Sequence, residues 1–339
     1  MTAHDLHAVA VAMVEKGRGI LAADESSPTI KKRFDSISLE STEEHRRSYR
    51  EMLFTTEGLG QHISGVILYD ETLRQSCADG TSFSRYLADH GMIPGIKVDA
   101  GAKALAGFPG EKITEGLDGL RDRLAEYADL GAKFAKWRAV IDIADGIPTD
   151  YCIRANAQAL ARYAALCQEG GIVPIVEPEV LMDGAHDLAR CEAVTGEVLS
   201  QVFSELHRHR VVLEHMVLKP NMVISGKKCP TQAGVEEVAE ATVRCLKRYV
   251  PAAVPGIAFL SGGQSDELAT AHLNAMNAGS ALPWHLTFSY GRALQAPALK
   301  AWGGRAENIA AGQAALGLRA RLNGLATRGE YSADMEQAA

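Results

Sequence analysis

The chain has 339 residues, of which 47% are hydrophobic and 23% are charged, the ordinary balance of a soluble globular protein. This composition argues against a disordered chain and against a membrane protein. The formal net charge of -7 argues against nucleic acid as a main partner, because binding to a phosphate backbone requires a basic face.

Eight short β-rich runs follow one another along the chain, and a longer segment with helical spacing of its apolar residues follows each run. We expect the strands at residues 17–24, 63–70, 92–99, 132–141, 172–180, 215–222, 256–263 and 284–291. No linker-like change in composition divides these repeats. The pattern therefore predicts an α/β protein with a single (β/α)8 TIM barrel over residues 1–330, followed by a short mobile tail at 331–339.

An open, doubly wound sheet is the alternative architecture. Neither a GxGxxG motif nor a P-loop follows any of the predicted strands, which favours the closed barrel. In such barrels the chemistry gathers at the carboxyl ends of the strands. Polar residues at these ends are therefore the first candidates for a site.

Cysteine and histidine usage predicts the compartment and the absence of a metal. The six cysteines show no metal-like spacing and are too sparse for a disulfide framework, so we expect a reducing cytoplasm. The closest histidines, His207 and His209, lie in a polar segment typical of a solvated helix rather than of a metal site. The apolar stretch from Ala8 to Val14 is short and lacks a basic lead, so we expect no export signal.

Two predicted strands each carry a pair of like charges. Lys136 and Arg138 lie in the fourth strand, and Glu177 and Glu179 lie in the fifth. Residues two apart on a strand point to the same face, so each pair projects together. If the strands are neighbours, two cations stand beside two carboxylates, and their attraction helps to keep all four ionised. We interpret these residues as the charged floor of a site.

Lys219 lies in the sixth strand, within the apolar sequence MVLKPNM. Loss of water disfavours its ammonium form, and a neighbouring cation such as Lys136 adds to this effect, so a neutral amine would be available to attack a ketone. The alternative is a lysine that extends to solvent or balances a carboxylate. Pro178 and Pro220 cannot donate to the strand ladder, which supports a position of Glu177 and Lys219 near the mouth.

Aspartate ends three of the predicted strands. Asp24 ends the first, in LAADESS, where it is either a functional group or the cap of the next helix. Asp70 and Asp99 end the second and third strands in the same way and stay unassigned.

The seventh and eighth strands lead into two turns suited to an anion, LSGGQS and FSYGRA. The candidate donors are Ser261, Gly262, Ser289, Gly291 and Arg292. Glycine lets backbone amides approach an anion closely, hydroxyls donate, and arginine supplies a bidentate charge. Phosphate sites of barrels often use these two loops, although the glycines could instead serve only a tight turn.

A second basic cluster predicts another anion site. Lys31, Lys32 and Arg33 begin the helix after Ser26, and Lys97 ends the third strand. Two anion sites across one mouth suit a substrate that carries phosphate at both ends.

Seven motifs, taken in chain order, resemble the class I fructose-1,6-bisphosphate aldolases: ILAADES, GIKVD, FAKWR, VPIVEPE, LKPNM, FLSGGQS and FSYGRALQ. The resemblance extends from about Gly17 to about Tyr331. It implies reversible cleavage of fructose 1,6-bisphosphate to dihydroxyacetone phosphate and glyceraldehyde 3-phosphate, in glycolysis and gluconeogenesis, without a metal or other cofactor. It also implies a homotetramer.

The resemblance further implies a role for each matching residue. Lys219 would form a Schiff base, Glu177 would act as the acid and base that dehydrates the carbinolamine, and Lys136 would assist it. Asp24 would accept the proton of the C4 hydroxyl, and Glu179 and Arg138 would position these groups. The phosphate nearer the ketone would be held by Ser261, Gly262, Gly291 and Arg292. The other phosphate would be held by Ser26, Lys32, Arg33 and Lys97.

The chain departs from the family pattern at two places. It stops at Ala339 without the terminal tyrosine of the animal members, so Tyr331, a side chain of the floor or the substrate phosphate would have to serve C3 proton exchange. Pro28 and Thr29 replace the smaller Gly-Ser pair that usually follows ADES, and Thr29 keeps a hydroxyl for the second phosphate.

Two further hypotheses stay open. One is another phosphate-binding barrel, such as an isomerase or an aldolase for a different sugar phosphate, because a fold does not fix a function. The other is a barrel that has lost catalysis and serves as a binding scaffold. The charged floor argues against the scaffold, since buried ionisable groups cost stability.

Overall fold

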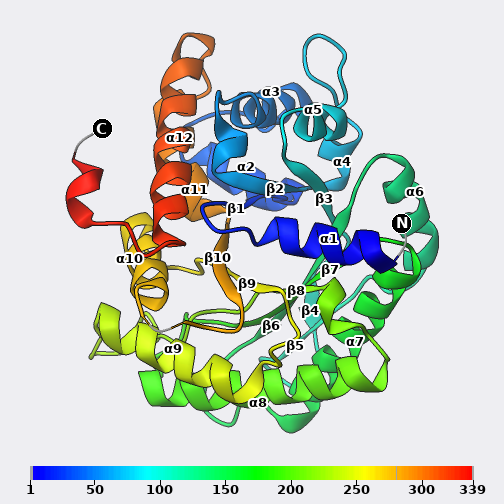
Figure 1. Ribbon diagram of the computed structural model, residues 1–339, viewed down its shortest axis with the longest axis vertical. Helices are drawn as coiled ribbons and strands as arrows, with labels where there is room; N and C mark the ends of the chain where they lie inside the picture. Colours follow the sequence, from blue (N-terminus) through cyan, green and yellow to red (C-terminus); the bar gives the residue numbers. More distant parts are fainter. Residues whose placement is uncertain (1–2, 280, 338–339) are drawn as a thin grey trace.

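The computed structural model describes residues 3–279 and 281–337, and its centre is a closed barrel of eight parallel strands (Figure 1). In order around the barrel, the strands are β1 (Gly19–Ala23), β2 (Ile63–Leu68), β3 (Ile93–Lys97), β6 (Phe134–Ile141), β7 (Val173–Val180), β8 (Val217–Leu218), β9 (Gly256–Phe259) and β10 (His285–Tyr290). Each lies inside its predicted range. The predicted TIM barrel is confirmed.

Helices surround the barrel and alternate with its strands. They are α1 (Ala3–Met13), α2 (Ser27–Asp35), α3 (Glu43–Phe54), α4 (Asp70–Leu73), α5 (Phe83–Asp89), α6 (Leu120–Asp129), α7 (Asp150–Glu169), α8 (Leu188–Arg208), α9 (Val235–Tyr249), α10 (Asp266–Asn277), α11 (Arg292–Trp302) and α12 (Ile309–Ala326). Among the described residues, no helix is long and apolar enough to cross a membrane.

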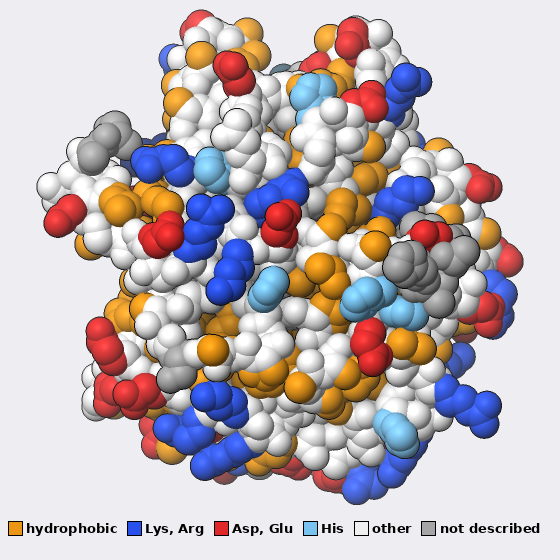
Figure 2. Space-filling model, in the orientation of Figure 1, with side chains coloured by type: hydrophobic (Ala, Val, Ile, Leu, Met, Phe, Trp, Pro, Cys, Tyr) orange, Lys and Arg blue, Asp and Glu red, His pale blue; other side chains and the backbone are white. Residues whose placement is uncertain are grey.

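The barrel interior is apolar at its amino end and charged at its carboxyl end. Ile20, Phe134, Val173 and other buried residues of the strands pack with residues of α1, which crosses the amino end of the barrel (Figure 1). On the face that Figure 2 shows, basic and acidic side chains are interspersed around this helix. The closed apolar end leaves the carboxyl end of the barrel as the place for a polar site.

The pairing of β6 and β7 sets the positions of the charged side chains. The two strands pair over all eight residues, with Arg138 opposite Glu177 and Val140 opposite Glu179. Trp137, between the two cations, points outward, where its ring stacks on Tyr163 of α7 at 5.6 Å between ring centres. This alternation confirms that the charged pairs face the barrel interior while the tryptophan packs against a helix.

Several strands end earlier than the sequence predicts. Strand β8 stops at Leu218 because Pro220 cannot continue the ladder, although the backbone N–H of Lys219 still donates to the Val176 carbonyl at 2.8 Å. Residues 261–263 form a turn beyond β9. A small antiparallel hairpin of β4 (Ala102–Ala104) and β5 (Lys112–Thr114) follows β3 and was not predicted, because strands of three residues are too short to give a clear periodicity.

The chain after α12 returns along the outside of the barrel (Figure 1). Its last described element is a 3-10 helix, Ala333–Glu336, where Glu336 pairs with Arg319 of α12 at 2.6 Å. The predicted tail 331–339 includes residues 338 and 339, which lie outside the described part, and its mobility stays a prediction.

Candidate active site

A cavity of about 550 Å³ opens at the carboxyl ends of the strands. Its lining contains all the residues predicted for the charged floor, the Schiff base and the two phosphates except Lys32. They are Asp24, Ser26, Thr29, Arg33, Lys97, Lys136, Arg138, Glu177, Glu179, Lys219, Ser261, Gly262, Ser289, Gly291 and Arg292. Residues that are distant in the sequence are thus brought to one mouth, because parallel strands of a barrel all end at the same face.

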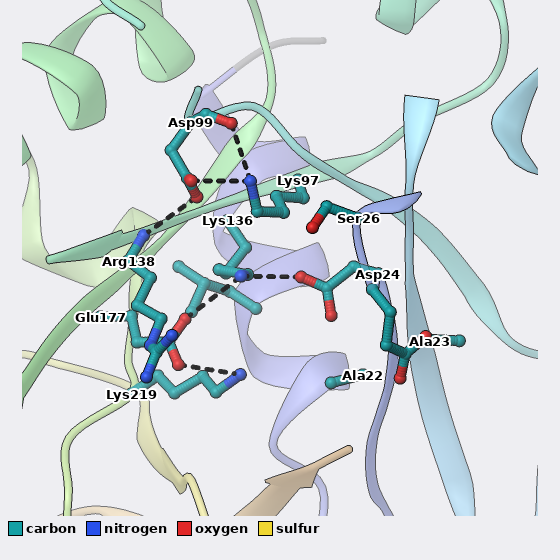
Figure 3. Close-up of polar contacts among 12 residues, drawn as sticks. Ala22, Ala23, Asp24, Ser26, Lys97, Asp99, Lys136, Arg138, Glu177 and Lys219 are labelled. Atoms are coloured by element: carbon teal, nitrogen blue, oxygen red, sulfur yellow. Dashed lines mark hydrogen bonds and ion pairs between the residues drawn. The ribbon is translucent and has the colours of Figure 1, made fainter. Parts of the chain in front are cut away.

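The floor of the cavity is a row of alternating charges (Figure 3). The Lys136 ammonium lies 2.7 Å from Asp24 Oδ2 and 3.5 Å from Glu177 Oε2. The other oxygen of Glu177 lies 3.2 Å from Lys219 Nζ. Lys136, Glu177 and Lys219 are each no more than 5% exposed. The row therefore places Lys219 beside a carboxylate, a second lysine and a second carboxylate, in a part of the cavity where three of these four side chains are almost fully buried.

The ionisation states of Asp24 and Lys136 depend on each other. Burial opposes the charged form of Asp24, but the ammonium groups of Lys136 and Lys219 outweigh it and hold the pKa of this carboxyl below its ordinary range. Burial also opposes the ammonium of Lys136, and here Asp24 and Glu177 outweigh it and raise the pKa of the lysine. Asp24 is therefore a carboxylate near neutral pH and is able to accept a proton.

The other two charged residues of the predicted floor belong to a separate set of ion pairs. Arg138 pairs with Glu179, and the backbone N–H of Arg138 donates to Asp99 Oδ2 at 3.3 Å. The other oxygen of Asp99 lies 2.7 Å from Lys97 Nζ, as Figure 3 shows. Asp99 thus holds both a cavity lysine and the backbone of β6, a role that the sequence analysis missed.

The turns after β9 and β10 form one donor group. Gly262 adopts a left-handed conformation with φ of +55°, which favours glycine. The Ser289 hydroxyl oxygen is buried and has no hydrogen-bond partner among the described residues. Arg292 begins α11 directly after Gly291, so its guanidinium and the amino end of that helix belong to the same corner of the cavity. Such an arrangement suits an anion.

A second donor group lies beyond the end of β1 and at the end of β3, and it belongs to the same cavity lining. The Ser26 and Thr29 hydroxyl oxygens are 3.2 Å apart, and Lys97 belongs to the same lining. Arg33 also lines the cavity, but a β-carbon built on Gly291 would lie only 3.6 Å from Arg33 Nη2. Arg33 therefore lies close to the first donor group, and its assignment to the second phosphate stays a prediction.

Comparisons with known proteins agree with this geometry. The family model described as fructose-bisphosphate aldolase class-I matches residues 5–339. The chain belongs to the class I fructose-bisphosphate aldolase family.

Individual relatives are similar over nearly their whole length. A protein of Xanthomonas campestris pv. campestris, named probable fructose-bisphosphate aldolase class 1, is 59% identical over 332 residues, covering 98% of this chain and 99% of the relative. Fructose-bisphosphate aldolase 2 of Caenorhabditis elegans is 54% identical, covering 97% and 90% of the two chains. The solved structure of the Plasmodium falciparum aldolase, in complex with TRAP and an inhibitor, matches with a TM-score of 0.96 at 51% identity, covering 97% and 96%.

Two residues assigned to this aldolase site from the sequence lie elsewhere. Lys32 is exposed on α2 and does not line the cavity, so its assignment to a phosphate gains no support. Tyr331 is also absent from the lining, and its hydroxyl donates to Glu336 Oε1 at 2.9 Å. Tyr331, one of the three sources considered for C3 proton exchange, therefore gains no support from its position.

Glu25 is a further cavity residue that the sequence analysis missed. Its carboxylate pairs with Arg33 at 2.5 Å and with the buried Arg50 at 2.7 Å, and Gln295 donates to it at 2.8 Å. The only feature of the sequence that could have indicated Glu25 is its position in LAADESS, between the candidate residues Asp24 and Ser26. Two hydrogen-bond donors and a second arginine hold this carboxylate, which in turn fixes the arginine that faces Gly291.

No group of three or more histidine, cysteine, aspartate or glutamate side chains in the described part of the chain could hold a metal ion. The expected metal independence stays a prediction.

Proposed function

We propose that the chain cleaves fructose 1,6-bisphosphate reversibly to dihydroxyacetone phosphate and glyceraldehyde 3-phosphate, as a lyase of glycolysis and gluconeogenesis, through a Schiff base on Lys219. Its membership of the class I aldolase family supports this reaction. The observation that carries the assignment of Lys219 is its buried amine, 3.2 Å from Glu177 in the floor of the cavity. A carboxylate beside an amine can accept and return the protons that move during imine formation.

The first half of the reaction uses Lys219 and Glu177. Glu177 accepts a proton from the Lys219 ammonium, and the neutral amine adds to the C2 ketone of the substrate. Glu177 then protonates the departing C2 hydroxyl of the carbinolamine, which leaves as water and gives an iminium. Lys136, 3.5 Å from Glu177, balances the changing charge on this carboxyl.

The second half uses Asp24. The Asp24 carboxylate accepts the proton of the C4 hydroxyl, and the C3–C4 bond breaks. The electron pair of the broken bond moves toward the iminium, which becomes an enamine. Glyceraldehyde 3-phosphate leaves. A proton returned to C3 and hydrolysis of the iminium release dihydroxyacetone phosphate and restore Lys219. The ion pair of Glu179 and Arg138 helps to hold the neighbouring charged side chains in position.

The two donor groups fit the two phosphates. Ser261, Gly262, Ser289, Gly291 and Arg292 would hold the phosphate nearer the ketone, and Arg33 lies beside them. Ser26, Thr29 and Lys97 would hold the other. Support for this division comes from the membership of both groups in one cavity lining.

The assembly and the compartment are also part of the proposal. We expect a homotetramer in the cytoplasm, with a phosphorylated sugar rather than nucleic acid as the ligand. Light scattering of the purified protein tests the assembly, and a monomer would contradict it.

A coupled assay with several sugar phosphates tests the reaction, with the wild type beside Lys219→Ala. We expect cleavage of fructose 1,6-bisphosphate by the wild type and its loss in Lys219→Ala. The matched control is Lys228→Ala, which removes an exposed lysine outside the cavity lining and should leave the rate unchanged. Preference for another sugar phosphate would favour the alternative enzyme, and a folded wild type without turnover would favour the scaffold.

A further inference from the structure

His272 is a buried imidazole behind the first donor group. It lies on α10 and is 1% exposed. Its Nδ1 lies 2.6 Å from the side-chain oxygen of Gln264, and its Nε2 has no hydrogen-bond partner among the described residues. Gln264 belongs to the turn LSGGQS after β9. The contact therefore links a helix outside the barrel to a turn of the cavity.

The hydrogen positions of this contact follow from its surroundings. The Gln264 side-chain nitrogen lies 3.0 Å from the Ser261 carbonyl, which can only accept a hydrogen bond. The amide must therefore direct its NH2 to Ser261 and its oxygen to His272. The imidazole must in turn carry its hydrogen on Nδ1.

Gln264 connects both parts of the donor group. Its side chain donates to the Ser261 carbonyl, and its backbone N–H lies 3.2 Å from the same oxygen. Its own carbonyl accepts a hydrogen bond from the Arg292 guanidinium. One residue thus contacts both the turn that carries Ser261 and Gly262 and the side chain of Arg292, which also lies 3.7 Å from Asp266.

We propose that His272 is a positioning residue, which, by donating from Nδ1 to Gln264, holds the Ser261–Gly263 turn and Arg292 in the geometry that binds a phosphate group. This inference rests on the proposed function, because the phosphate in question is the one nearer the ketone. His272 itself does not line the cavity and acts only through Gln264.

The state of the imidazole is consistent with this role. Burial lowers the pKa of His272 to about 4, although Glu236 opposes the shift, so the ring is neutral near pH 7. A neutral imidazole has one N–H, and here that N–H goes to Gln264. Without it the Gln264 oxygen would be buried and unpaired, and the side chain would turn away from Ser261.

The test measures phosphate affinity in His272→Leu, His272→Asn and Gln264→Leu. Titration with inorganic phosphate, followed by phosphorus NMR, reports on the donor group without catalysis. We expect about tenfold weaker binding in His272→Leu, as for the loss of one buried hydrogen bond, with a parallel rise in KM for fructose 1,6-bisphosphate and little change in kcat. Asparagine places an amide N–H near the position of Nδ1, so His272→Asn should retain affinity within about twofold.

Two controls separate positioning from general damage. Leu273→Val shortens the buried side chain of the next residue of α10 by one methylene and should leave phosphate affinity unchanged. In a Gln264→Leu background, His272→Leu should add almost nothing, because its effect passes through Gln264. Equal affinity in His272→Leu and wild type, or full additivity with Gln264→Leu, would overturn the inference.

The same measurements distinguish this inference from the proposed function. If the wild type binds phosphate, His272→Leu binds it more weakly, and the wild type does not cleave the sugar, the positioning role of His272 stands and the proposed reaction is wrong. If the wild type cleaves the sugar and His272→Leu binds phosphate as tightly as the wild type, only the positioning role of His272 is wrong.

Discussion

Removal of Lys136 should destabilise the protein mainly by leaving a carboxylate unpaired. In the wild type the floor holds two carboxylates, Asp24 and Glu177, and two ammonium groups, Lys136 and Lys219. Lys136→Met removes the only cation within 4 Å of Asp24 among the described residues, whereas Glu177 keeps Lys219. Breaking a buried pair in this way costs about 3–5 kcal/mol of the free energy of unfolding.

The double variant Lys136→Met/Asp24→Asn separates charge from packing. It restores the charge balance of the floor, so it should be less destabilised than the sum of the two single variants by about 1–3 kcal/mol. Urea unfolding at pH 7 measures all four proteins. In the single variant Lys136→Met, the cost should shrink as the pH falls, because the unpaired Asp24 can then bind a proton. Additive costs within about 0.5 kcal/mol would refute the reasoning.

Three further predictions concern the phosphate site, pH and metals. Arg292→Ala should raise KM for fructose 1,6-bisphosphate at least about tenfold, with partial recovery in Arg292→Lys, and unchanged kinetics would refute the anion site. His272 has a pKa of about 4 in the fold against an ordinary 6.5, so the unfolded chain binds more protons between these values and stability falls as the pH drops through this window. Urea unfolding at pH 7 and 4.5 should show that the wild type loses about 2 kcal/mol more than His272→Leu, and equal losses would contradict the shift. Cleavage should persist in excess EDTA, whereas loss restored by zinc would indicate a metal-dependent enzyme.

The sequence predicted the barrel and most of its site because both depend on local patterns. Strand-helix alternation is visible in the periodicity of apolar residues, and parallel strands bring their ends to one mouth whatever lies between them. Lys136 and Glu177 stood out because charged residues inside apolar strands are uncommon. Recognition of the motif set then assigned roles that spacing alone left open.

The partners of these residues could not be predicted because they depend on packing in three dimensions. Asp99 carried the same strand-end signal as Asp70, yet the first pairs with Lys97 in the cavity and the second with Arg74 outside its lining. Lys32 and Arg33 are adjacent in the sequence, but only Arg33 turns toward the cavity. The direction of a side chain on a short helix depends on where the helix packs.

The central claim is that Lys219 forms the imine. The protein is incubated with dihydroxyacetone phosphate, treated with borohydride, digested and examined by peptide mass spectrometry. A reduced adduct on the peptide that contains Lys219, absent from the sample without borohydride, is the predicted result. An active enzyme whose Lys219 peptide stays unmodified at saturating ketone would contradict the account.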